Sequence, residues 1–165
     1  MTNWIQRILN AAADLITRVK GLDDIHDDLA GVVTDADPRV MGRAQTAATT
    51  IDLDQGIGTY DLFTGTAEVV ILESLNIKLP TGAPGGTLTS ISIQTDDATP
   101  GVIISAANGD VANLLTEADL GWTGTLYITV GTKIRLTIAG GPSVADYICN
   151  VTAKCRAVVA GGNLA

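Results

Sequence analysis

The sequence predicts a mainly β protein, in which an N-terminal coiled-coil-like α-helix precedes an antiparallel β-sandwich of jelly-roll type. Three observations predict this fold class. An apolar register of seven residues runs through the first thirty or so positions. Later segments alternate apolar and polar residues, and turns rich in Gly, Pro and Asp separate them at the spacing of antiparallel strands. We divide the chain into an oligomerisation or docking helix (residues 1–34), a connector (35–46) and a sandwich domain (47–165).

The N-terminal segment is predicted to be helical because its apolar residues recur at alternating spacings of three and four. The predicted oligomer interface consists of the seam positions Ile5, Ile8, Ala12, Leu15, Val19, Leu22, His26 and Leu29. A second apolar set, Trp4, Leu9, Ile16 and Ile25, flanks the seam and is predicted to dock on another protein. Isoleucine at seam positions favours three strands, although a dimer stays open. His26 either sets the register or meets its copies around a shared ion, and we favour the first role.

The first half of the sandwich domain contains five predicted strands, at residues 49–53, 58–65, 68–79, 87–95 and 102–105. Within the third of these, Leu75 and Ile77 share one parity, while Val70, Leu72 and Glu73 break the alternation, as either a β-bulge or a covered second face would. Residues 111–120 are compatible either with one or two helical turns or with an irregular loop.

The second half of the domain contains three predicted strands, at residues 122–130, 133–139 and 147–159. A short connection through Gly131 joins the first two, which predicts a hairpin. On the outward side of the last two strands, basic residues follow a Lys-x-Arg pattern: Lys133, Arg135, Lys154 and Arg156. If the two strands are adjacent, these residues either form a small basic patch that docks on an acidic neighbour or are ordinary solvated charges across the strands, and the second is the more common case.

The last predicted strand holds both cysteines of the chain, Cys149 and Cys155, on its buried side. Six residues along one strand correspond to about 20 Å, which is too far for a disulfide. The sequence therefore predicts two free, buried thiols.

Composition and motifs exclude several classes of function. The net charge of −8 disfavours nucleic acids and anionic membranes as partners, and no apolar run is long enough to span a bilayer. Aromatic residues make up 4% of the chain, which weighs against sugar-stacking platforms. No nucleophile elbow, HExxH motif or phosphate loop occurs, and the acidic residues near Asp24 lack the glycine of a calcium loop. We therefore predict no enzyme activity, no catalytic residues, no cofactor and no metal site.

Two stretches carry a resemblance to a known group of proteins. They are GTYDLFTGTAEVVILESLNIKLPTGAPGGTLTSISIQTDDATPGVIIS and WTGTLYITVGTKIRLTIAGG. Over residues 48–160 the texture of the chain resembles small structural proteins encoded near the head genes of tailed bacteriophages. The resemblance implies a virion protein, a homotrimeric capsid decoration (cement) or head-fibre protein, whose partners are copies of itself and the major capsid protein or another virion protein.

The same resemblance implies a location on the capsid surface of the virion, after synthesis in the host cytoplasm. Two alternatives stay open at this stage. One is the receptor- or glycan-binding knob of a tail fibre, and the other is a polysaccharide-cleaving enzyme with a carboxylate pair in a cleft.

Overall fold

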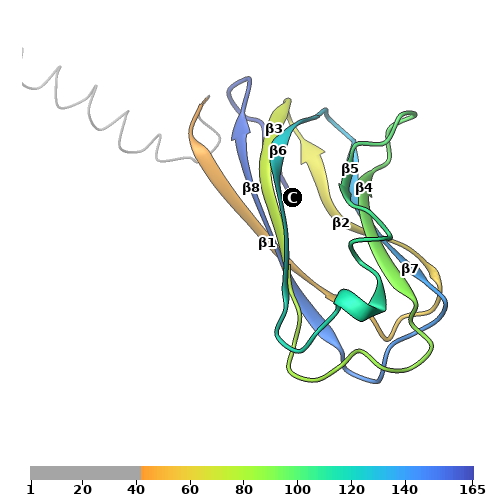
Figure 1. Cartoon of the computed structure of the whole chain (residues 1–165). Coiled ribbons are helices and arrows are strands. Elements are labelled where there is room, and N and C mark those ends of the chain that lie inside the picture. Colours follow the sequence, from red (N-terminus) through yellow and green to blue (C-terminus); the bar gives the residue numbers. More distant parts are fainter. Residues whose placement is uncertain (1–41) are drawn as a thin grey trace, which may run out of the picture. The chain divides into compact units, whose positions relative to one another are not determined.

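Two antiparallel β-sheets face each other across the core of the protein (Figure 1). This computed structural model describes residues 42–165. Their strands and one 3₁₀ turn are β1 (Ala44–Asp52), β2 (Gly58–Thr66), β3 (Val70–Lys78), β4 (Ser90–Thr95), β5 (Val102–Ile104), η1 (Val111–Asn113), β6 (Asp119–Ile128), β7 (Lys133–Ala139), β8 (Ile148–Ala157) and β9 (Asn163–Leu164).

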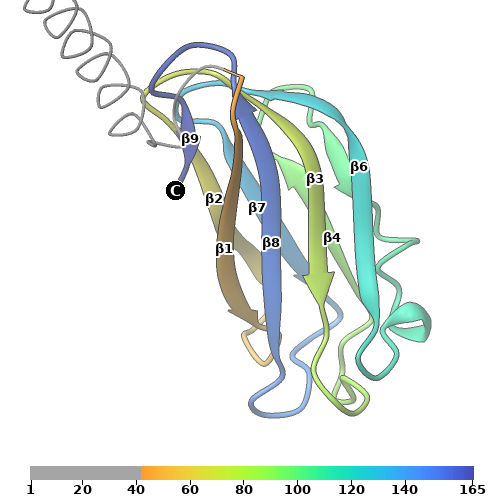
Figure 2. The same cartoon turned by 90° about the vertical axis from the view of Figure 1, so that its left-hand side faces the viewer.

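The order of the strands identifies the sandwich as a jelly roll. One sheet has the order β1-β8-β3-β6 and the other β5-β4-β7-β2-β9, and Figure 2 shows the first of them face on. Strands β1 to β8 thus form the two four-stranded sheets of an eight-stranded jelly roll, and β9 adds a short fifth strand beside β2. The predicted antiparallel, jelly-roll-like sandwich is confirmed.

The core lies between the sheets and is built from the inward-facing residues of every long strand. Ile77 in β3, Ile93 in β4 and Leu136 in β7 have no exposed surface. Burying one such side chain contributes about 1.5–3 kcal/mol relative to leaving it in water. Strict alternation along β7 and β8 places mostly polar residues on the opposite side of each strand, as the sequence predicts, with Ile148 as an exposed exception.

The interruption at Glu73 is a β-bulge, which is one of the two explanations that the sequence left open. The pairing of β3 with β8 shifts between Leu72 and Ser74, which leaves Glu73 as the extra residue. Leu72 and Leu75 are consequently both buried although they lie three positions apart. A second bulge follows Asp61 in β2, and it lets the adjacent Leu62 and Phe63 both turn inward.

The predicted hairpin of residues 122–130 with 133–139 is wrong, because β6 and β7 belong to different sheets. β6 pairs with β3, whereas β7 pairs with β2 and β4. The connection between them crosses the sandwich and passes close to β2: a Cβ on Gly65 would lie 2.4 Å from the Thr129 carbonyl oxygen. Gly131, with φ 84°, supplies the left-handed conformation that this turn requires.

The predicted fold class needs one correction, which concerns its helical part. No α-helix occurs in residues 42–165, where the only helical element is the single turn η1. The predicted coiled-coil segment, residues 1–34, lies outside the described residues. A heptad register does not by itself make a coiled coil, because its seam is buried only when another helix covers it. The fold class that the structure supports is therefore an antiparallel β-sandwich.

Two elements differ in extent from the prediction. β1 begins at Ala44 rather than at Thr49, because pairing with β8 recruits residues of low strand propensity. β9 is too short to produce an alternating pattern, and it forms because its two residues pair with Gly65 and Thr66. Residues 111–120 contain one 3₁₀ turn, η1, and the Asp110 side chain caps its N-terminus.

Candidate interaction surfaces

The described residues bring together no group of the kind that metal binding requires. Within residues 42–165, no three His, Cys, Asp or Glu side chains are placed to share a metal ion. No helix in this part of the chain is long and apolar enough to cross a membrane. The predicted interface residues Ile5, Ile8, Ala12, Leu15, Val19, Leu22, His26 and Leu29, and the flanking Trp4, Leu9, Ile16 and Ile25, lie outside the described residues.

The outer side of the four-stranded sheet is one candidate surface. Small uncharged residues from all four strands line it, and we call it the small-residue face: Thr46, Ala48, Thr50, Ser74, Asn76, Gly121, Thr123, Asn150 and Thr152. One row across the sheet consists of Ala48, Thr152, Asn76 and Gly121. Between β1 and β8 this face is hollowed into a shallow groove of about 550 Å³.

Charged residues border the small-residue face at both ends, and they are paired within the chain. Glu73, held out by its bulge, contacts Arg156 and lies 3.1 Å from the Lys154 ammonium nitrogen. The hydrogen bond from Arg156, reinforced by one from Lys154, lowers the pKa of the Glu73 carboxyl below its ordinary value. At the other end Lys78 and Asp119 are 3.0 Å apart. A partner that covered this face would therefore meet few charges that need a new counterion.

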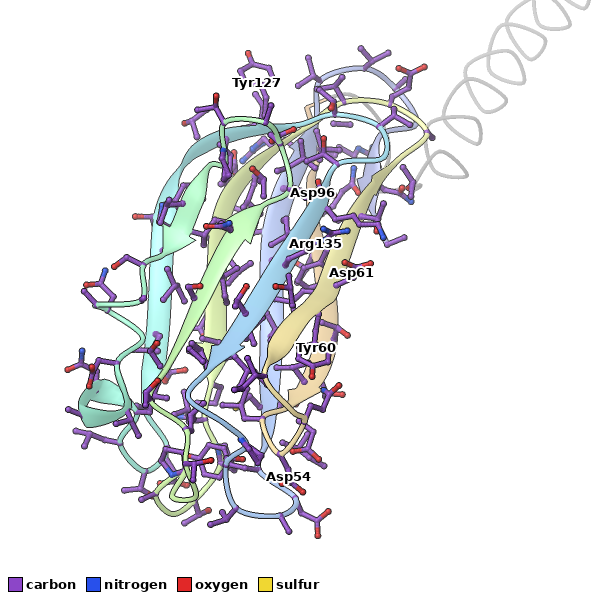
Figure 3. The ribbon with its side chains drawn as sticks, turned by 90° about the vertical axis from the view of Figure 1, so that its right-hand side faces the viewer. Asp54, Tyr60, Asp61, Asp96, Tyr127 and Arg135 are labelled. Atoms are coloured by element: carbon purple, nitrogen blue, oxygen red, sulfur yellow. The ribbon has the colours of Figure 1, made fainter. Side chains whose placement is uncertain are left out.

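The outer side of the five-stranded sheet carries a second charge cluster (Figure 3). Asp61 accepts hydrogen bonds from Lys133 at 2.5 Å and from Arg135 at 2.8 Å, and Arg135 also lies 3.5 Å from Asp96. The hydrogen bond from Lys133 lowers the pKa of the Asp61 carboxyl, and Arg135 acts in the same direction. A polar groove of about 300 Å³ runs beside Arg135 and Asp96.

The basic patch that the sequence offered as an alternative does not form, because the two strands are not adjacent. Lys133 and Arg135 lie in β7 of the five-stranded sheet, whereas Lys154 and Arg156 lie in β8 of the other sheet. The two pairs therefore lie on opposite sides of the sandwich, and each pair forms ion pairs with one carboxylate. β7 and β8 follow each other in the chain, but they belong to different sheets, so their outward side chains are not neighbours.

Both cysteines are free and fully buried, as predicted. Burial raises the pKa of the Cys149 thiol to about 12, and it raises the pKa of Cys155 as well. Thiols held neutral in this way are poor nucleophiles and poor metal ligands. Their role in the described domain is packing.

One end of the sandwich exposes apolar side chains that the sequence analysis had not singled out. Tyr127, Val130 and Val159 are 60%, 57% and 46% exposed, and they lie near the ends of β6 and β8, which run in the same direction. Alternation places Val130 on the buried side of its predicted strand. It is exposed because β6 already ends at Ile128.

Comparison with known proteins identifies the fold. No protein-family model matches the chain, and no curated protein sequence is significantly similar to it. Among solved structures, a chain in the capsid of Helicobacter pylori bacteriophage KHP30 is similar at a TM-score of 0.51 and 11% identity, over 76% of this chain and 95% of that chain. A chain in the capsid of cyanophage Pam1 is similar at a TM-score of 0.49 and 15% identity, over 71% and 86%.

A further structure in the comparison is the VP2 subviral particle of infectious bursal disease virus, at a TM-score of 0.41 and 13% identity, over 72% of this chain and 34% of that chain. At 11% identity the KHP30 similarity establishes a shared fold. The resemblance to phage virion proteins is thus confirmed at the level of the fold.

Proposed function

We propose that this chain is a non-enzymatic structural protein of a tailed-phage virion, and that it decorates the outside of the capsid as a cement or head-fibre protein. The jelly-roll fold carries the proposal. The similarity spans 95% of a chain in the KHP30 capsid, so nearly all of that chain corresponds to this sandwich. The resemblance of residues 48–160 to phage structural proteins supports the same role independently of the fold.

The surface chemistry of the described domain supports a role in contacts rather than in catalysis. Its ion pairs form between residues of the same chain, at Glu73 on one sheet and at Asp61 on the other. Contacts of modest strength that symmetry repeats over a shell are sufficient to stabilise it, so no single residue has to dominate. We propose three copies in each assembly, as the resemblance implies.

We propose that the small-residue face is the side that meets the shell. Covering a charged side chain requires compensation for the lost hydration, and this face has an uncharged centre with paired charges at its ends. Its short side chains also lose little conformational entropy on contact. For these two reasons the small-residue face can pack tightly against the shell.

Rebinding to capsids tests the proposal. Heads assembled without the chain are mixed with the purified full-length protein and sedimented, with separated tails as the comparison. We expect saturable binding to heads. Thr152→Lys, in the centre of the small-residue face, should weaken it at least tenfold, whereas the control Thr59→Lys, an exposed threonine of the five-stranded sheet, should not.

Three outcomes contradict parts of the proposal. Binding to tails and not to heads would support the tail-fibre knob instead, and binding of purified glycans on an array would strengthen that alternative. Loss of head binding in Thr59→Lys but not in Thr152→Lys would move the contact to the other sheet. If the measured mass of the assembly does not correspond to three copies of the chain, the proposed copy number is wrong.

A further inference from the structure

Three of the four sheet edges in the described domain carry a feature that hinders pairing with another chain. β5 and β9 have only three and two residues. β6 is interrupted where its pairing shifts between Leu126 and Thr123, next to Gly124. Short strands and bulges are the devices by which natural sheets protect their edges.

The fourth edge, β1, has none of these devices (Figure 2). Its nine residues pair with β8 without a register shift. Neither a charged residue nor a proline occurs between Arg43 and Asp52. An edge of this length and regularity presents a row of backbone donors and acceptors that suits another strand.

The register shows which residues of β1 turn their backbone groups toward that open edge. The Leu53 amide donates to the Tyr147 carbonyl oxygen at 3.1 Å, in line with the pairing of Asp52 with Ile148. Hydrogen-bonded and non-hydrogen-bonded positions alternate along an antiparallel pair. Odd-numbered residues of β1 therefore bond to β8, and the backbone groups of the even-numbered residues face outward: Ala44, Thr46, Ala48, Thr50 and Asp52.

We propose that β1 pairs with β1 of a second copy of this chain, antiparallel and centred on Ala48. The two four-stranded sheets then join into one continuous sheet. In this register Ala48 faces its own copy, and Thr46 faces Thr50 of the second copy on both sides of the centre. Cross-strand threonine pairs are favourable, and no bulky side chain obstructs the approach.

Charge favours a second copy, in this orientation, as the occupant. Arg43 precedes the strand, and Asp52 and Asp54 lie at its other end. Antiparallel pairing brings the basic end of each strand next to the acidic end of the other, whereas parallel pairing would place like charges together. Two chains of net charge −8 repel each other in general, so an uncharged strand with complementary ends is a suitable place for them to meet.

The pairing joins chains two at a time. It would therefore link two of the proposed trimers rather than build one. The inference does not depend on the capsid role, because the purified chain alone tests it.

An engineered disulfide tests the pairing directly. Opposed residues at a hydrogen-bonded position have their Cα atoms about 5.5 Å apart, within the range of about 4.4–6.8 Å that a disulfide spans. Under mild oxidation, full-length Ala48→Cys should become mostly a covalent dimer on a non-reducing gel, and reductant should reverse the link. The native thiols are buried and should not contribute.

Two matched variants serve as controls. The first is Thr152→Cys: Thr152 pairs with Ala48 within one chain, but it lies on β8 inside the sheet and not at the open edge. The second is Thr46→Cys, whose thiol would face Thr50 of the second copy and not another thiol. Neither should form the dimer. The double variant Thr46→Cys with Thr50→Cys should form it again, because the two positions face each other across the proposed axis.

Self-association provides a second measurement on variants without new thiols. Ala48→Lys places two ammonium groups opposite each other at the centre, so sedimentation equilibrium should show association at least tenfold weaker than for Thr152→Lys. The proposal is overturned if Ala48→Cys forms no more dimer than Thr152→Cys. Equal association of the two lysine variants would also overturn it.

Discussion

Deletion of Glu73 is the perturbation whose outcome depends most sharply on the bulge in β3. Without Glu73, the residues on either side continue a regular alternation: Leu72 and Leu75 stay inward, and pairing with β8 becomes continuous. The deletion removes a partly exposed carboxylate with its two ion pairs and alters the bulged pairing with β6, but it leaves the buried side chains of β3 facing inward. We expect the midpoint of thermal unfolding to fall by no more than a few degrees.

Deletion of Asn76, three positions further along the same strand, is the matched comparison. It turns Ile77 and Leu79 outward, and these are 0% and 2% exposed in the native fold. Loss of two buried side chains corresponds to about 3–6 kcal/mol, out of a total stability of about 5–15 kcal/mol. At about 3–5 °C per kcal/mol for a domain of this size, the midpoint should fall by roughly 9–30 °C.

Circular dichroism or calorimetric melting of both deletions measures the difference. Glu73→Ala, which keeps the extra residue and removes the carboxylate, separates the effect of the ion pairs from that of the bulge. The reasoning is refuted if deletion of Glu73 is as damaging as deletion of Asn76. It is also refuted if deletion of Asn76 leaves the midpoint unchanged.

Three further predictions concern the charge clusters, the thiols and the core. The pKa values of Asp61 and Glu73 are lowered in the folded state, so their stabilisation is present above the ordinary carboxyl pKa and is lost as pH falls through the lowered values. In urea titrations below about pH 4, the stability of the double variant Asp61→Asn with Glu73→Gln should depend less on pH than that of the native chain; equal dependence would contradict the assignment. Cys149, with a pKa of about 12 against an ordinary value of 9.0, should resist thiol reagents at pH 8 until the chain unfolds. Its raised pKa also means that stability declines as pH rises from about 9 toward 12, and rapid labelling of the native protein would refute the burial. Leu136→Ala should cost about 3 kcal/mol in chemical denaturation, whereas Thr137→Ala on the outer side of the same strand should cost less than about 1 kcal/mol; similar losses would contradict the core assignment.

Alternation in the sequence was sufficient to predict most strands, because it reports directly which side of a strand is buried. Residues 133–139 were predicted and observed as a strand with the same limits. The interruption at Glu73 was visible for the same reason, since a single extra residue reverses the parity of everything that follows, but alternation alone did not distinguish a bulge from a strand covered on both faces. Burial of both cysteines followed from their shared parity.

Neighbouring strands could not be predicted in this way. Alternation along residues 122–128 and 133–139 is compatible equally with a hairpin and with strands in opposite sheets, and the choice depends on contacts with β3 and β2 distant in the chain. The false basic patch has the same origin. The small-residue face has no sequence motif at all, because threonine, alanine and asparagine are common on any exposed strand, and only the register aligns them.

The position of the chain in the virion decides whether it decorates the capsid. Density maps of particles with and without the gene should be subtracted, at a resolution that permits the sandwich to be fitted. The account predicts difference density for a jelly roll on the outer surface of the head, with the small-residue face of Asn76 and Thr152 toward the shell. Difference density confined to the tail or to the interior of the head, or its absence from the particle, would contradict it.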